Sequence, residues 1–547
     1  MGTLKKRHIT VLICVFAVCI GIAACWKWTT DQRGSNAGIP DTETSQTTLF
    51  SYYINPKTPP NIARELQKYL ENAGFELQNG PEGATVAISP TEPSNDTFVC
   101  FYQIWALARP YGALLAPVST NITQISDRID ALAPMDILPE GYTVSENARF
   151  VPWADFADGT SDTANDSDID ALTLLTLQDI QSSYTVQSIE GIDPFAKDTW
   201  LQPTYPLIST VYVTGPTSTI YKLSDYLDTS GFFEENGYLT ALPSPDDMLT
   251  IIKTGTTVSG GPGWELCEQV HGSIDYPIFE VENILSSADL TIISNEASFV
   301  EGCAQGAGTT AFCGKPSYIQ NLIDIGTDIV SLTGNHMCDY GKTAFSDMLT
   351  TYDQHGISYF ASGRNTTEAW TPLVVNTDAG KIAFIGVNFM GSAGVLATES
   401  TTGTAFYESE AFRDAISSAK ETTDIVWVDT QLWPEYGTSP GADQISISRE
   451  AIDAGADIVT GVSSHEMQGM TIYNGKPVFY GLGNFLFDQM WSTATRQGLI
   501  LELTVYDGTI RQITPMPTVL YDYCQPRFAQ GNERTTLLDY FLSISSL

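Results

Sequence analysis

The sequence predicts an α/β protein whose C-terminal part is a layered domain of α/β sheets flanked by helices, preceded by a further α/β domain. Three observations support this fold class. The 547 residues suffice for two to four domains at about 150 residues each. Hydrophobic residues make up 43% of the chain, enough for sizeable cores. From about residue 249 onward, apolar strand-like runs alternate with helical patterns, which is typical of a largely parallel sheet covered by helices.

The chain is strongly acidic. It has 26 Lys and Arg against 64 Asp and Glu, a formal net charge of −38. Binding to nucleic acid needs basic patches, and none appears in the sequence, so we expect no nucleic-acid partner. An anionic polymer would be repelled by most of this surface. Its binding would need a local cationic site, such as a metal ion.

The first 25 residues have the features of an export signal. Lys5, Lys6 and Arg7 precede an apolar run of 17 residues from Ile9 to Cys25, the length of a signal-peptide core and marginal for a spanning helix. The run ends in Ile-Ala-Ala-Cys25, which resembles a bacterial lipobox and implies lipidation of Cys25. The alternative is an uncleaved membrane anchor. Both predict a tether at the extracytoplasmic face of the cell membrane.

The cysteine count agrees with export to an oxidising compartment. Six cysteines follow the signal region, an even number that permits fifteen pairings: Cys100, Cys267, Cys303, Cys313, Cys338 and Cys524. Cys303 and Cys313 bracket a short Gly/Thr-rich loop, so we expect a disulfide between these two.

We divide the remaining chain into four parts. Residues 26–48 lack periodicity and read as a flexible tether. Residues 49–246 form the first α/β domain, which begins with an amphipathic helix from Asn61 to Gly74. Residues 247–527 form the layered domain, and 528–547 form a C-terminal segment.

The layered domain shows six strand-like runs with helical segments between several of them. The strands are expected at Leu249–Lys253, Asp289–Ser294, Asp328–Leu332, Ile382–Val387, Asp424–Asp429 and Asp457–Thr460. The helices are expected at Ser317–Gly326, Thr343–His355, Ala411–Glu421 and Ser446–Gly455. Two later segments read as hairpins, with turns at Asn474-Gly475 and Asp507-Gly508.

Polar side chains follow the ends of these strands. Ligands of open parallel sheets bind at the carboxyl ends of the strands, so these residues are candidates for one site. They are Glu296, Asn335, His336, Gln431, His465 and Asn484. Imidazole, carboxylate and amide groups together suit a divalent metal ion. The alternative is that they cap helices or form structural hydrogen bonds.

Three segments resemble the CapA family of capsule and poly-γ-glutamate synthesis proteins. Asn335-His336-x-x-Asp339-x-Gly341 resembles the family's N-H-x-x-D-x-G motif. The segment from Gly481 to Asp488 is similar to its S-L-G-N-F-x-F-D stretch, and the segment from Ala288 to Glu296 to its A-D-L-x-I…N-L-E stretch. The resemblance covers about residues 248–525 and implies a calcineurin-like metallophosphoesterase fold.

The sequence departs from that family at expected metal ligands. Thr256 stands where the family has Asp, and Gln431 and Ser463 each stand where it has His. A hydroxyl or amide is a poorer ligand than a carboxylate or imidazole. The resemblance therefore implies either one divalent metal (Mn, Zn or Mg) held by Glu296, Asn335 and His465 with help from Gln431, or no metal.

The resemblance also implies roles for single residues. His336 would protonate a leaving group, and Asp339 would either orient His336 or cap the helix starting near Thr343. Arg496 and Asn484 are candidates for substrate binding, with a structural ion pair as the alternative for Arg496. In the first domain, Ile192-Asp-Pro-Phe195 and the segment Tyr205–Tyr212 resemble the second lobe of periplasmic phosphate-type binding proteins, which implies a domain of two lobes.

Two functions follow as hypotheses. The first is a membrane-tethered, CapA-like protein in synthesis, export or anchoring of an anionic capsule polymer such as poly-γ-glutamate, with a metal-dependent hydrolase or transferase site. Its partners would be the polymer or its synthesis machinery. The second is a non-catalytic binding or scaffold protein with a degenerate metallophosphoesterase-like domain.

Overall fold

The structure, a computed structural model, describes residues 51–58, 60–82, 84–89, 93, 98–110, 149–150, 171–186, 192–201, 205, 208–258, 260–303, 310–391 and 394–546. The predicted signal region with Cys25 and the predicted tether lie outside these residues. Among the described residues, no helix has both the length and the apolar character needed to cross a membrane.

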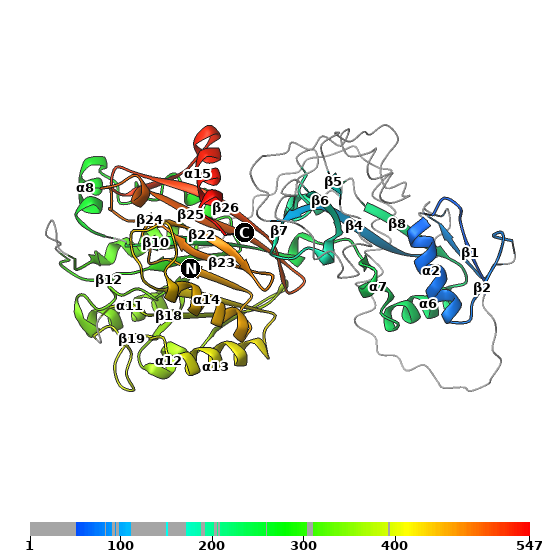
Figure 1. The fold of residues 1–547 in the computed structure, drawn as a ribbon, viewed down its shortest axis with the longest axis horizontal. Coiled ribbons are helices and arrows are strands. Elements are labelled where there is room, and N and C mark those ends of the chain that lie inside the picture. Colours follow the sequence, from blue (N-terminus) through cyan, green and yellow to red (C-terminus); the bar gives the residue numbers. More distant parts are fainter. Residues whose placement is uncertain are drawn as a thin grey trace, which may run out of the picture.

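Two large sheets form the part of the chain after residue 247 (Figure 1). The eight-stranded sheet has the order β15-β14-β11-β10-β25-β26-β27, with β24 paired to β10. Its strands are β10 (Met248–Thr257), β11 (Leu290–Asn295), β14 (Thr327–Ser331), β15 (Ser358–Phe360), β24 (Asn484–Leu486), β25 (Gln497–Tyr506), β26 (Thr509–Tyr521) and β27 (Gln525–Phe528). The six-stranded sheet has the order β17-β18-β20-β21-β23-β22. Its strands are β17 (Leu373–Thr377), β18 (Gly380–Asn388), β20 (Ile425–Gln431), β21 (Ile458–Gly461), β22 (Met467–Tyr473) and β23 (Lys476–Leu482).

All six predicted strands are confirmed as β10, β11, β14, β18, β20 and β21. In each sheet these strands run parallel to one another, and every residue of β20 is buried, as expected for strands covered on both faces. The two predicted hairpins are also present, as β22–β23 and β25–β26. Asn474, Gly475, Asp507 and Gly508 all have positive φ, the conformation that tight two-residue hairpin turns require.

The sheets and helices stack in four layers. One apolar core lies between the two sheets and includes Ile292, Phe384 and Trp427. The outer face of the eight-stranded sheet packs on α8 (Pro262–His271), α10 (Ile319–Asp324) and α11 (Gly341–His355). The outer face of the six-stranded sheet packs on α13 (Ser409–Lys420) and α14 (Ala442–Ala454). The C-terminal helix α15 (Gly531–Ser543) joins the core between the sheets through Leu537 and Phe541. This arrangement is the layered α/β fold that the sequence predicts.

Short elements complete this part. They are α9 (Glu282–Leu285), α12 (Thr366–Trp370), the 3₁₀ turns η5 (Pro316–Tyr318) and η6 (Ala494–Arg496), and two small sheets formed by β12 (Ser298–Phe299) with β13 (Cys313–Gly314) and by β16 (Ser362–Gly363) with β19 (Gly403–Thr404).

The first region is a separate mixed sheet with helices. Its order is β2-β1-β3-β8-β4-β6-β5, with β7 and β9 paired to β4. The strands are β1 (Ser51–Ile54), β2 (Glu76–Leu77), β3 (Val86–Ser89), β4 (Phe98–Pro110), β5 (Arg149–Phe150), β6 (Ala171–Thr176), β7 (Tyr184–Val186), β8 (Ile208–Thr214) and β9 (Tyr238–Leu239). The helices are α2 (Pro60–Asn72), α5 (Lys197–Leu201), α6 (Thr217–Thr229) and α7 (Phe232–Glu235), with 3₁₀ turns η3 (Leu177–Asp179) and η4 (Pro245–Asp247). Helix α2 matches the predicted amphipathic helix.

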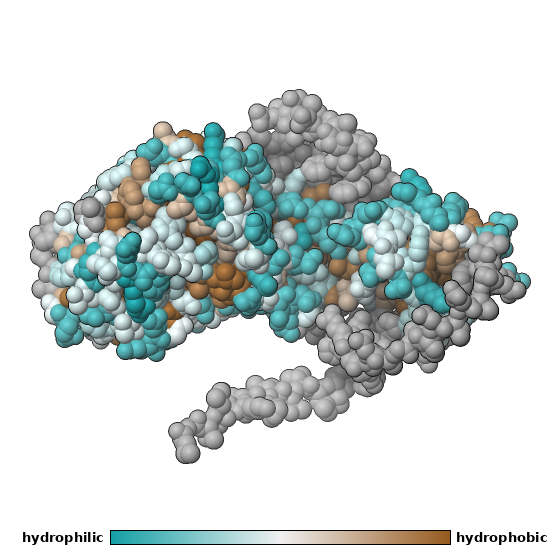
Figure 2. Space-filling model, turned by 90° about the horizontal axis from the view of Figure 1, so that it is seen from below, coloured by the Kyte–Doolittle hydropathy of each residue, from teal (hydrophilic) through white to brown (hydrophobic). Residues whose placement is uncertain are grey.

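Polar and apolar contacts join the first region to the layered part. Met248 and Tyr506 pack into an apolar cluster whose other members belong to the first region. The buried side chain of Arg511 on β26 donates hydrogen bonds to the backbone oxygens of Gln178 (2.5 Å) and Ile180 (2.9 Å). On the face drawn in Figure 2, hydrophilic residues predominate among the coloured atoms and hydrophobic residues form scattered patches.

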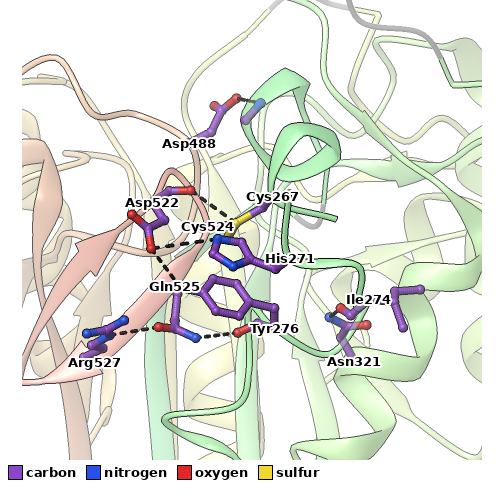
Figure 3. The surroundings of a disulfide bond; sticks show 11 residues. Cys267, His271, Ile274, Tyr276, Asn321, Asp488, Asp522, Cys524, Gln525 and Arg527 are labelled. Carbon is purple, nitrogen blue, oxygen red and sulfur yellow. Dashed lines mark hydrogen bonds and ion pairs between the residues drawn. A yellow bond between two sulfur atoms is a disulfide. The ribbon is translucent and has the colours of Figure 1, made fainter. Parts of the chain in front are cut away.

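Two disulfides cross-link the layered part. Cys303 is joined to Cys313, the pair that the sequence favours. Cys267 on α8 is joined to Cys524, which lies between β26 and β27 (Figure 3). Beside it the ring of His271 stacks on Tyr276, whose hydroxyl donates to Asp522. Cys267 and Cys524 are 257 residues apart in the sequence, so their disulfide closes a long loop and restricts the unfolded chain strongly. This bond therefore contributes to the stability of the layered part.

Candidate functional site

The candidate site lies where strands of both sheets end. Glu296 directly follows β11, and Asn335 and His336 follow β14, both in the eight-stranded sheet. Gln431 is the last residue of β20 in the six-stranded sheet. Gly334 allows the loop after β14 to lie directly against Glu296, because a Cβ at residue 334 would come within 2.8 Å of the Glu296 Cα atom. The two sheets therefore bring their strand-end loops to one edge.

Gln431 connects the two sheets at this edge. Its Nε2 atom lies 2.9 Å from Glu296 Oε1 and 3.0 Å from Asn335 Oδ1. Both distances are those of N–H···O hydrogen bonds, so both amide hydrogens of Gln431 are used. Glu296 and Gln431 are almost fully buried, yet Glu296 Oε2 and Gln431 Oε1 have no hydrogen-bond partner within the described chain. Two buried acceptor atoms are thus left without a donor.

His336 is oriented by a carboxylate. Its Nδ1 atom lies 2.8 Å from Asp339 Oδ2, which also accepts a hydrogen bond from the backbone N–H of Phe312. Burial would lower the pKa of His336, but the hydrogen bond to Asp339 and the neighbouring charge of Glu296 outweigh it and raise the pKa above its usual value. Helix α11 begins at Gly341 without a side-chain cap. Asp339 therefore holds His336 and does not cap the helix.

His465 is held by Asn484. Its Nδ1 atom lies 2.9 Å from Asn484 Oδ1. Because Asn484 Nδ2 donates to the backbone oxygen of Thr495 and to Gln489, the Oδ1 atom accepts and His465 Nδ1 carries the hydrogen. The backbone of His465 has a φ of +56°, an uncommon conformation for a residue with a side chain, which often marks functional positions. Asn484 thus positions the imidazole ring of His465.

Glu435 is a further carboxylate that follows the strand ending in Gln431. Burial raises the pKa of Glu435, as does the charge of Glu296, while His465 and His336 act in the opposite direction. The charges that act on Glu435 are therefore those of Glu296, His336 and His465. Tyr436 stacks on His465 with ring centroids 5.4 Å apart, and it too has a positive φ, of 54°.

The other predicted residues take structural roles. The Thr256 hydroxyl donates to the backbone oxygen of Val462. The Ser463 hydroxyl accepts from the backbone N–H of Leu432 and donates to its oxygen. Arg496 donates to the backbone oxygen of Leu520, and none of the described residues forms an ion pair with it. The ion pair considered for Arg496 therefore has no partner among the described residues.

A buried ion pair lies next to the site residues, further back along the same strands. Lys253 Nζ on β10 is 2.5 Å from Asp429 Oδ2 on β20, and both side chains are fully buried. The same nitrogen is 2.5 Å from the hydroxyl of Ser294 on β11. Asp429 precedes Gln431 by two residues and Ser294 precedes Glu296 by two, so the ion pair ties together the strands that carry the site. Desolvation lowers the pKa of Lys253 even though Asp429 opposes the change.

Part of the predicted metal-ligand set at the strand ends is used in hydrogen bonds. A metal ligand must direct a lone pair at the ion. Here Glu296 Oε1 and Asn335 Oδ1 both accept hydrogens from the Gln431 amide, which can coordinate nothing through Nε2. Among the described residues, no group of three or more His, Cys, Asp or Glu side chains could hold a metal ion. The predicted set of Glu296, Asn335, His465 and Gln431 comes together in part, as a hydrogen-bonded cluster.

Comparison with known proteins agrees with the family-like motifs. Residues 250–489 match the family model for the bacterial capsule synthesis protein PGA_cap. The PGA biosynthesis protein CapA of Bacillus subtilis is 30% identical over 276 residues, which cover 50% of this chain and 72% of that protein. The capsule biosynthesis protein CapA of Bacillus anthracis is 29% identical over 208 residues, which cover 37% of this chain and only half of that protein.

Solved structures are more distant. The NAD nucleotidase NadN of Haemophilus influenzae has a TM-score of 0.30 at 12% identity, covering 55% of this chain and 64% of that chain. An ABC-type phosphate transport receptor from Vibrio cholerae has a TM-score of 0.22 at 12% identity, covering 36% of this chain and all of that chain. Family membership therefore depends on the sequence matches, in which the B. subtilis protein is covered over more than two thirds of its length. This chain belongs to the PGA_cap family of bacterial capsule synthesis proteins.

Proposed function

We propose that this protein takes part in the synthesis, export or anchoring of an anionic capsule polymer, such as poly-γ-glutamate, at the extracytoplasmic face of the cell membrane. The match of residues 250–489 to the capsule synthesis family carries this proposal. That stretch contains every member of what we call the strand-end cluster, namely Glu296, Asn335, His336, Gln431, His465 and Asn484. The lipobox-like segment ending at Cys25 supports a membrane tether.

The geometry of the site favours a binding role without a metal. The Gln431 amide joins Glu296 to Asn335, and the hydroxyls of Thr256 and Ser463 are bonded to the backbone. The hydroxyls of Thr256 and Ser463 therefore do not take over as metal ligands at those two positions. The site then serves to hold a ligand while other components of the machinery act on the polymer.

Acid catalysis without a metal is the second candidate, and one observation favours it. His336 is held by Asp339, and its raised pKa favours the protonated imidazole that an acid catalyst needs. The leaving group of a bond broken beside His336 would receive that proton, while water forms the new bond to the group from which it departs. The binding role needs no such transfer, so the two candidates differ in their need for the imidazole.

Deleting the gene in its host and measuring anionic polymer at the cell surface tests the proposal. Loss of surface polymer, restored by the wild-type gene, is the expected result. Complementation with His336→Ala separates the two roles, because a binding role tolerates this variant and acid catalysis does not. His355→Ala, an exposed histidine at the end of α11, serves as the matched control. Unchanged surface polymer after deletion would contradict the proposal.

A further inference from the structure

The disulfide between Cys303 and Cys313 lies beside the strand-end cluster. Phe312, the residue directly before Cys313, contacts His336 in a T-shaped arrangement, with ring centroids 4.6 Å apart. Aromatic rings attract one another in this geometry. The backbone N–H of Phe312 also donates to Asp339 Oδ2, 2.8 Å away, the same oxygen that lies 2.8 Å from His336 Nδ1. Phe312 therefore contacts both the imidazole and the carboxylate that orients it.

Phe312 also links His336 to the second histidine of the cluster. The ring centroids of Phe312 and Phe487 are 5.4 Å apart, and both side chains belong to one small apolar cluster. The ring of Phe487 in turn stacks on His465, again with centroids 5.4 Å apart. His336 follows a strand of the eight-stranded sheet and His465 follows a strand of the six-stranded sheet. Two phenylalanine rings thus connect the imidazoles that the two sheets supply.

The disulfide limits how far Phe312 can move. Cys313 is fully buried, and the pairing of β13 with β12 begins at this residue, so Phe312 lies just before the paired strand. Cys303 precedes Cys313 by ten residues, and the bond between them closes a loop that contains Phe312. A closed loop has fewer conformations open to it than the same segment without the bond. Opening the disulfide would therefore allow Phe312 to leave His336.

We propose that the Cys303–Cys313 disulfide, acting through the positioning residue Phe312, holds His336 in place, so that the arrangement of the strand-end cluster depends on the redox state of this pair. Reduction by a dithiol breaks the S–S bond. Each cysteine sulfur gains one electron and one proton, and the dithiol becomes a disulfide. His336 would then take its place only in an oxidising compartment, where structural disulfides persist. The inference concerns regulation of the site proposed above and rests on the proposed function for its biological role.

Nuclear magnetic resonance of the full-length protein, with ¹³C in its histidine rings, tests the inference. The chain has five histidines, so single substitutions by glutamine assign each ring signal. The readout is the order parameter of each ring, which measures how rigidly that ring is held. Cys303→Ser opens the disulfide at its half-buried end and should lower the order parameter of His336. Dithiothreitol should lower it to the same value in the wild-type protein, and oxidised glutathione should restore it.

Cys267→Ser is the matched control, because it opens the other disulfide. Cys267 and His271 lie one turn apart on α8, beside that bond (Figure 3). This variant should therefore change the signal of His271 and leave the order parameter of His336 unchanged.

Substitutions of Phe312 test the ring with both disulfides intact. Phe312→Leu keeps an apolar side chain but removes the ring, so it should lower the order parameter of His336, whereas Phe312→Tyr keeps the ring and should preserve it. Unchanged circular dichroism spectra show that the variants fold, and if Cys303→Ser does not fold, reduction of the wild-type protein and Phe312→Leu decide.

Three results would each overturn the inference: an unchanged order parameter of His336 after the disulfide is opened, an equal fall in Cys267→Ser, or an unchanged value in Phe312→Leu. No ligand enters these measurements. They therefore succeed or fail separately from the surface-polymer test of the proposed function.

Discussion

The buried ion pair between Lys253 and Asp429 gives a sharp stability prediction. Lys253→Met keeps the length and the apolar stem of the side chain but leaves the Asp429 carboxylate buried without its cation. Breaking a fully buried pair in this way costs about 3–5 kcal/mol. The loss should appear as a lower urea midpoint with an unchanged slope, followed by tryptophan fluorescence. The surface pair of Lys197 with Asp289 is about one-third exposed, so Lys197→Met should cost less than about 1 kcal/mol.

The double variant Lys253→Met/Asp429→Leu tests the cause. It removes both charges from the core between the sheets, so it should recover most of the stability that Lys253→Met loses. A cost below about 1 kcal/mol for Lys253→Met, or no recovery in the double variant, would refute the reasoning that an uncompensated charge dominates.

Three further predictions follow from the described contacts. Gln431→Glu places a second carboxylate 2.9 Å from Glu296, so it should lower the free energy of unfolding by about 2 kcal/mol at pH 8 and by much less at pH 5, as measured by urea unfolding at both values. Burial raises the pKa of Asp193, so this group contributes stability that is lost as the pH rises above about 4; Asp193→Asn should remove that part of the pH dependence in melting curves. Arg511→Met removes two hydrogen bonds from a buried guanidinium to backbone oxygens of the first region, so it should cost about 3 kcal/mol or more and speed proteolysis at the junction.

Strands with long apolar runs could be predicted from the sequence because burial on both faces leaves a continuous signal. This holds for β18 and β20, and the glycine turns of the two late hairpins were equally clear. The pairing of strands that are far apart in the sequence could not be predicted. Whether β24 joins β10 depends on the tertiary path of the chain and not on local pattern.

The members of the site could be predicted, but their arrangement could not. Reading the residues after each strand found Glu296, Gln431 and His465. The sequence does not reveal which atom of Gln431 faces Glu296, and that orientation decides which oxygens of the cluster accept hydrogen bonds. The sequence also indicates a buried ion pair at Lys253, because a lysine within an otherwise apolar strand needs a buried partner.

The Gln431 amide bonds Glu296 to Asn335 in the strand-end cluster, and we expect no stoichiometric divalent metal ion there. Elemental analysis of the full-length protein tests it most directly, after incubation with Mn²⁺ and Zn²⁺ and dialysis without chelator. The account predicts metal well below one ion per chain, with no difference between wild type and His465→Ala. A stoichiometric metal that is lost in His465→Ala would contradict it.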